Sequence, residues 1–212
     1  MKHIPDMSIR QLVVVLYTHK KLEYMEMGTI ELVMGQLLLE SAAWEAQDIA
    51  LMLNTLSFFY IYNPKWWKIC ANKIPEVSGQ FSPISLSLIL SAYARVDFRH
   101  TPSLNVLARS VKHRAENDML DATSLSVLIN SFTKLDVSNA VLDDVLHGAV
   151  VRKVEKALTF ESPEERIDHK KNNVFDVHSL VMLAHSLICF NKCSDDLAVK
   201  LLALITPHSG KL

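Results

Sequence analysis

The sequence predicts an all-α protein, an α-solenoid of about five helix-turn-helix repeats with a period of about 37 residues. Two observations support this prediction. The segment SLSLILSAYARV, at residues 85–96, recurs along the chain, and each copy is followed by a second helical pattern with its own start signal. Recurrence at such a spacing is typical of repeat proteins, in which each repeat buries its apolar face against its neighbours.

The recurring segment is twelve residues long, and its second residue is apolar in every copy. The copies occupy residues 11–22, 48–59, 85–96, 124–135 and 179–190. Their second residues, separated by 37, 37, 39 and 55 positions, are Leu12, Ile49, Leu86, Leu125 and Leu180. Positions 2, 5, 9 and 12 form one helical stripe, and position 8 is small, which favours close helix packing. In the first copy position 9 is His19, and a register one turn earlier is the alternative there. We therefore expect the five residues to occupy equivalent buried sites.

The repeats are expected at residues 7–43, 44–80, 81–119, 120–158 and 175–207, within a single helical-repeat domain, residues 1–212. The third first helix is expected to begin at Ser82–Pro83. Second helices are expected to begin at Gly28–Thr29, Asn63–Pro64, Thr101–Pro102, Ser138 or Asn139, and Ser194–Asp195. The long last spacing contains the charged segment 159–174, which lacks an apolar stripe and is predicted to be an exposed loop.

Composition excludes several classes of protein. Half of the residues are hydrophobic, which argues against disorder, and no apolar run reaches the ~18 residues of a membrane span. The three cysteines do not form a disulfide framework and favour a reducing compartment. The formal net charge of -1 provides no global electrostatic reason for binding nucleic acid.

The repeat length and the pattern S/D-L-x-x-[LIM]-x-x-[AST]-[LYF] resemble the heptatricopeptide repeats of organellar proteins from protists, which are similar to the helical repeats of the FASTK and RAP-domain family. The resemblance runs from about Met7 to Ile205. It implies RNA binding in the mitochondrial matrix, either as a mitochondrial ribosome component that contacts rRNA or as an organellar RNA-processing factor. The implied partners are ribosomal or transcript RNA and other proteins of a ribonucleoprotein complex.

The first helices supply candidate RNA-binding residues on the side opposite the buried stripe, at positions 3, 7 and 11. Position 7 carries side chains that can hydrogen-bond to or stack on an unpaired base, namely Tyr17, Asn54, Ser91, Asn130 and His185. Position 11 supplies cations for phosphate groups, namely Lys21, Arg95 and Lys134. The alternative is an ordinary solvated helix face.

The second helices add a predicted basic stripe for the phosphate backbone. Its residues are Lys65, Lys68, Arg109, Lys112, Arg114, Arg152, Lys153 and Lys156. The alternative is a normal helix surface with cations near helix C-termini, where the helix dipole favours them. Of the adjacent Trp66 and Trp67, the second fits the apolar stripe and is predicted to be in the core.

Signals for catalysis and metal binding are weak. The sequence has no Gly-rich phosphate loop, nucleophile elbow or His-Glu-x-x-His pattern, so no enzymatic activity and no cofactor are expected. His185, Cys189 and Cys193 are spaced along one helical face, but a structural zinc site needs four ligands, and a buried cysteine commonly acts as a small hydrophobe. The second functional hypothesis is therefore a protein–protein scaffold within a large complex, which the near-neutral charge favours.

Overall fold

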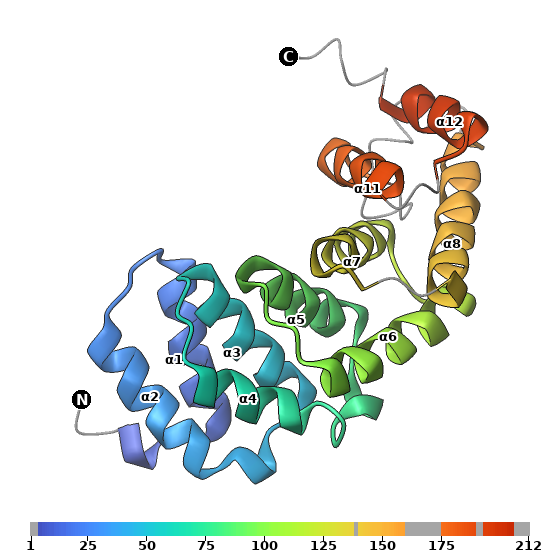
Figure 1. Cartoon of the computed structure of the whole chain (residues 1–212). Helices are drawn as coiled ribbons and strands as arrows, with labels where there is room; N and C mark the ends of the chain where they lie inside the picture. Colours follow the sequence, from blue (N-terminus) through green and yellow to red (C-terminus); the bar gives the residue numbers. More distant parts are fainter. Residues whose placement is uncertain (1–3, 138–139, 160–174, 190–192, 206–212) are drawn as a thin grey trace. The chain divides into compact units, whose positions relative to one another are not determined.

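The computed structural model describes residues 4–137, 140–159, 175–189 and 193–205. The regular structure of these ranges is helical throughout, without a strand, which confirms the all-α prediction (Figure 1). None of the helices within these ranges is both long and apolar enough to cross a bilayer. Residues 160–174 of the predicted loop at 159–174, and the start signals Ser138 and Asn139, lie outside the described residues.

The chain forms two compact units, residues 1–110 and 111–212, and the border lies within one helix. Unit 1 contains α1 (Ile9–Lys21), α2 (Met27–Leu39), α3 (Ala46–Phe58), α4 (Pro64–Lys73), α5 (Pro83–Val96) and most of α6 (Thr101–Glu116). Short 3-10 helices lie at Ile4–Asp6, Ser41–Ala43 and Ser78–Gln80. Unit 2 contains α7 (Ala122–Leu135), α8 (Ala140–Leu158), α11 (Val177–Cys189) and α12 (Asp195–Ile205).

Within unit 1 the first helices of successive repeats pack in sequence order. Helix α3 contacts α1 on one side and α5 on the other, while α2 packs on α1 and α4 packs on α3 (Figure 1). Each predicted repeat is thus one helical hairpin laid against the next. This consecutive packing is the α-solenoid arrangement that the sequence predicts.

Unit 2 repeats the same arrangement. Helix α7 packs against α11 and α8, and α12 packs against α8 and α11. The first helices α7 and α11 are therefore neighbours, although their anchor residues are separated by the longest spacing in the sequence. The segment between α8 and α11 changes the chain length without changing the order in which the helices stack.

The predicted anchor residues occupy the core of every repeat. Each of the five side chains has at most 1% of its surface exposed: Leu12, Ile49, Leu86, Leu125 and Leu180. The small residues at position 8 are buried in four of the five copies, namely Thr55, Ala92, Ser131 and Ser186. Thr18, the corresponding residue of the first copy, is exposed, because α1 has a first-helix neighbour on only one side.

Every first helix that is described through its end finishes in the same backbone motif. The residue directly after the twelve-residue segment has a positive φ of 51° to 54° in the four copies, at Glu23, Tyr60, Asp97 and Asp136. The next amide donates to the carbonyl of position 9, at 3.0, 2.8, 2.9 and 3.1 Å in the same order. This hydrogen bond is the 6→1 bond of a Schellman motif, which ends a helix by satisfying one of its last carbonyls. The shared motif shows that the first copy has the predicted register.

The described helix starts lie at or within one residue of the predicted start signals, in α2, α4, α5, α6 and α12. The side chains of Asn63 and Ser82 cap α4 and α5, as predicted. Helix α2 begins at Met27, one residue before Gly28, because the Glu26 carboxylate caps it. Helix α6 already includes Thr101, and the ring of His100 accepts a hydrogen bond from the amide of Ser103 at 3.4 Å.

Truncation of an anchor residue is expected to destabilise the fold. Ile49→Ala should lower the free energy of unfolding by about 2 to 5 kcal/mol, because it leaves a cavity between packed helices. Ile84→Ala removes the same atoms from a side chain that is 66% exposed and should change this free energy by less than about 0.5 kcal/mol. Urea denaturation followed by circular dichroism measures both, and equal losses would contradict the assigned core.

The backbone motif at the helix ends makes a second prediction. Glu23→Gly should stabilise the protein by about 0.5 to 1 kcal/mol, because glycine adopts a positive φ without the steric cost that a side chain incurs. The same substitution at the exposed Glu31, inside α2, should destabilise it by about 1 kcal/mol. Effects of the same sign in urea denaturation would show that Glu23 is not strained.

Candidate nucleic-acid interface

Basic and aromatic side chains meet where the first helices of unit 1 end. The Nζ atom of Lys20 in α1 lies 5.7 Å from the centre of the Tyr17 ring and 5.6 Å from that of the Phe58 ring in α3. The Nζ atom of Lys21 lies 5.5 Å from the Tyr17 ring centre. We call these four residues, together with Arg95 in α5, the cationic cluster. Cations at these distances from ring faces are attracted by the ring electrons.

The third helix joins the cluster through a hydrogen bond. Arg95 Nη1 donates to the Ser57 hydroxyl of α3 at 2.8 Å, so α1, α3 and α5 are all linked at their C-terminal ends. The repeats stack in register, and equivalent last turns therefore lie side by side. These turns also favour cations because the C-terminal end of a helix is electronegative.

The positive charge of the cluster is not neutralised by neighbouring acids. Among the side chains that the structure describes, no carboxylate oxygen lies within 4.0 Å of a nitrogen atom of Lys20, Lys21 or Arg95. Burial of the ammonium group, followed by the positive charges of Arg95 and Lys21, lowers the pKa of Lys20. Like charges held together in this way attract an anion.

The residues at positions 3 and 7 are less accessible than the sequence predicts. Val13, Ala50 and Ser126 at position 3 are buried, and Asn54 at position 7 is only 3% exposed. Both the predicted RNA-binding face and its alternative, a solvated helix face, require exposure, and these four side chains lack it. Asn54 and Ala50 are covered because α1 and α5 pack on either side of α3.

The other position 7 residues are half-buried or exposed. The Ser91 hydroxyl donates to the carbonyl of Leu88 at 3.2 Å, which satisfies its donor locally. Tyr17 and Asn130 are half-buried, and His185 is exposed, with its Nε2 atom 3.9 Å from Cys189 Sγ. Exposure therefore increases toward the C-terminal end of each first helix, where Lys21, Arg95 and Lys134 at position 11 are all exposed.

The basic residues of the second helices in unit 1 are at the surface. Lys65 and Lys68 of α4 are exposed, whereas Trp66 is half-buried. Trp67 is fully buried and donates its ring N–H to the carbonyl of Ile61 at 3.0 Å, which confirms its predicted core position. Arg109 is exposed and donates to the carbonyl of Asn105, in the preceding turn, at 3.3 Å.

Several predicted basic residues between 111 and 158 have hydrogen-bond or ion-pair partners within the chain. Lys153, only 6% exposed, pairs with Asp118 at 3.0 Å, and Arg152 donates to the carbonyl of Ala115 at 2.9 Å. Lys112 lies 3.7 Å from Glu116, and Arg114 is half-buried. Lys156 is exposed. Whether the basic residues of α4, α6 and α8 form one continuous stripe stays a prediction.

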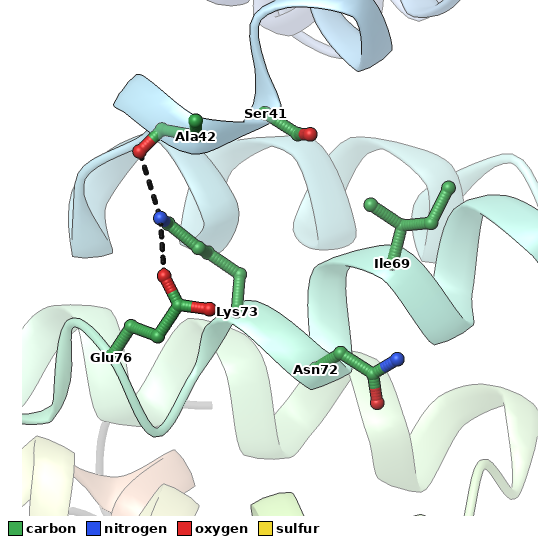
Figure 2. A pocket seen from close by; sticks show the side chains of 6 residues that line it. All are labelled: Ser41, Ala42, Ile69, Asn72, Lys73 and Glu76. Atoms are coloured by element: carbon green, nitrogen blue, oxygen red, sulfur yellow. Dashed lines mark hydrogen bonds and ion pairs between the residues drawn. The ribbon is translucent and has the colours of Figure 1, made fainter.

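The opposite end of unit 1, where the first helices begin, is acidic. It carries Asp6, Glu40, Glu45, Asp48 and Glu76. A hollow of about 300 Å³ lies there, lined by the residues drawn in Figure 2. In it, Lys73 Nζ donates to the Ala42 carbonyl at 2.8 Å and to the Glu76 carboxylate at 2.6 Å. A second hollow of about 550 Å³ includes the Arg10–Asp48 ion pair at 3.3 Å. The two cations at this end, Arg10 and Lys73, are paired with acids, unlike the cations of the cationic cluster.

The described residues contain no group of three or more His, Cys, Asp or Glu side chains placed to hold a metal ion. Cys189 is exposed and Cys193 half-buried, so the expected role as buried hydrophobes is wrong for this pair. Cys70 does occupy the core, and burial raises the pKa of its thiol to about 12.

Sequence reasoning missed Lys20 and Ser57 as members of the site, and it gave Phe58, which is position 11 of the second copy, no role in binding. Lys20 lies at position 10, which is not one of the predicted binding positions 3, 7 and 11, yet its side chain extends to α3. The available signal was the concentration of basic residues in the last turn of α1, at His19, Lys20 and Lys21. The contact with Phe58 depends on the packing between repeats, which the sequence does not show.

The stacked hairpins define a helical-repeat protein, and its cationic cluster suits a polyanionic ligand. The model of the RNA-editing substrate-binding complex 6 protein family matches residues 7–140, which is more than half of the chain, and the chain therefore belongs to this family. No curated protein matches it. The family confirms the expected association of a helical protein with RNA, while the link to heptatricopeptide repeats stays a prediction. The matched range contains the whole cationic cluster.

The electrostatic coupling within the cluster can be measured. Arg95→Gln should raise the pKa of Lys20, because it removes one of the positive charges that lower it. Arg99→Gln is the matched control and should leave this pKa unchanged, since Arg99 is bound to Asp97 at 2.7 Å. NMR titration of the lysine side chains measures the shift, and an unchanged Lys20 pKa in Arg95→Gln would show that the two charges are apart in solution.

Proposed function

We propose that this protein is a non-catalytic, RNA-binding component of an RNA-editing substrate-binding complex. The single observation that carries the proposal is the cationic cluster, which lies within the range matched by the family model. The name of the family supplies the class of complex, and the cluster supplies a means of contacting RNA. The partners are RNA and the other proteins of the complex.

The mechanism is binding without chemistry. Lys20, Lys21 and Arg95 contact phosphate oxygens of the RNA backbone, and the Tyr17 and Phe58 rings beside them offer stacking surface to unpaired bases. No step requires a cofactor or a metal ion. Because most contacts go to phosphates, binding depends on salt and varies little with base sequence.

The location of the protein is proposed to be mitochondrial. This rests on the resemblance to heptatricopeptide-repeat proteins, which also implies contact with ribosomal RNA. The name of the matched family favours RNA editing over membership of a mitochondrial ribosome. The RNA substrate of editing would be the bound RNA in that setting.

A second candidate function, a protein–protein scaffold, is favoured by the outer face of α2. Leu32 and Leu39 on this helix are 52% and 79% exposed, and no atom lies within 4 Å of the place that a Cβ atom of Gly35 would occupy. Exposed apolar side chains around a small residue allow another helix to approach closely. A protein of a ribonucleoprotein complex can use both surfaces at once.

The double variant Lys21→Gln/Arg95→Gln tests the RNA-binding function. Its affinity for single-stranded RNA should fall about tenfold at low salt. The slope of log affinity against log salt should decrease in magnitude by about 1.4, because each lost phosphate contact on a single strand contributes about 0.7. Fluorescence anisotropy with a labelled oligouridylate over a range of salt concentrations measures both quantities.

The matched control is Arg10→Gln/Lys73→Gln, which removes the same two residue types from the acidic end of unit 1. Its affinity and salt slope should match those of the wild-type protein. If the wild-type slope is near zero, or if both variants bind equally weakly, the scaffold function is correct and RNA binding by the cluster is not.

A further inference from the structure

We propose that the loops after α3 and α5 form a base-stacking site for single-stranded RNA, in which the Tyr62 and His100 rings receive unpaired bases and Lys68 contacts a phosphate. The inference rests on the proposed function and adds a second contact with the RNA, made mainly by uncharged aromatic rings. None of the position 7 or position 11 residues belongs to this site. It lies at the same end of unit 1 as the cationic cluster, because both loops directly follow first helices.

The site is an aromatic cluster that continues from the core to the surface. The Phe98 ring is at its centre, with ring-centre distances of 4.9 Å to Tyr93, 5.2 Å to Trp67, 6.1 Å to His100 and 6.3 Å to Tyr62. Tyr93 and Trp67 are fully buried, whereas Tyr62 is 53% exposed. A tyrosine this exposed normally has few contacts, but Tyr62 packs on both Phe98 and Trp67.

Hydrogen bonds to buried groups hold the His100 ring in place, and ring contacts with Trp67 and Phe98 hold the Tyr62 ring. His100 Nδ1 lies 3.0 Å from the Ser103 hydroxyl, which in turn lies 3.1 Å from the Tyr93 hydroxyl. The His100 ring is stacked on Phe98, with an angle of 6° between the two planes. A ring that is fixed before binding loses little conformational entropy when a base stacks on it. The aromatic cluster is therefore a preformed platform.

The charges around the platform suit a nucleic acid strand. Lys68 is exposed and directly follows Trp67, whose ring packs on Tyr62 and Phe98. Burial of the imidazole, followed by the positive charge of Lys68, lowers the pKa of His100. His100 is therefore a neutral aromatic ring at neutral pH. Arg99 is paired with Asp97 at 2.7 Å, so Lys68 is the nearby cation that is available to a phosphate group.

The platform and the cationic cluster are close enough for one strand to contact both. Tyr62 follows Phe58 by four residues, and Phe98 follows Arg95 by three, so the Cα separations are at most about 14 Å and 11 Å. A strand whose phosphates lie on Lys21 and Arg95 thus reaches the platform within a few nucleotides. Paired bases in a duplex do not expose their faces, so the ligand is single-stranded.

The experiment compares Tyr62→Leu with Tyr62→Phe in the full chain, using the labelled oligouridylate and salt series described above. Loss of the ring should weaken binding about tenfold without changing the salt slope, because the contact is a stack and not an ion pair. Tyr62→Phe keeps the ring and should bind within twofold of wild type, about the resolution of the method. Tyr60→Leu is the matched control, since Tyr60 is 71% exposed and has no ring contact in the described structure.

Two further measurements keep the result interpretable. Urea denaturation shows whether Tyr62→Leu remains folded, and photocrosslinking of wild-type protein to thiouridine-containing RNA identifies the contacted peptide without any substitution. Crosslinks in the peptides containing Tyr62 or His100 are expected. If wild type binds RNA and Lys21→Gln/Arg95→Gln weakens it, but Tyr62→Leu does not and crosslinks map elsewhere, this inference alone is wrong. If wild type does not bind RNA, the proposed function fails first.

Discussion

The burial of each first helix between its neighbours is the constraint on which the rest of unit 1 depends. Helix α3 contacts α1 and α5, and its anchor residue Ile49 is completely buried. Hydrophobic burial of this kind supplies most of the free energy that orders a helical hairpin, because a single hairpin cannot cover its own apolar face. The small residues Thr55 and Ala92 lie at the same position of successive copies and allow the helices to approach closely.

The same packing decides where RNA can be contacted. A first helix that is covered on two sides cannot expose a row of side chains along its whole length. Asn54 of α3 is buried for this reason. In α3, residues 48–57 are buried except for the half-buried Leu51, and exposure returns only at Phe58 and in the loop after the helix. The same Schellman motif ends α1, α3 and α5 at the equivalent residue of each repeat. Their last turns therefore meet at one end of unit 1. The cationic cluster is the product of this alignment.

Charge separation within unit 1 explains how a chain with a net charge of -1 can offer a surface to a polyanion. Acids gather where the first helices begin, where Arg10 and Lys73 pair with Asp48 and Glu76. Lys20, Lys21 and Arg95 gather at the other end without acidic partners within ion-pair distance in the described structure. Local arrangement of charge, and not the total, determines the field that a nearby ligand experiences.

The sequence by itself determined the helical-repeat architecture. Residues spaced like Leu86, Ile89 and Tyr93 lie on one face of a helix, and the recurrence of this pattern along the chain indicates a repeat protein. It also determined most helix starts, since a cap such as Asn63 acts on amides two or three residues away. Only the tertiary structure decided which polar residues are accessible. The contact of Lys20 with Phe58 and the hydrogen bond from Arg95 to Ser57 each join residues 38 positions apart, and such contacts depend on how neighbouring repeats approach one another.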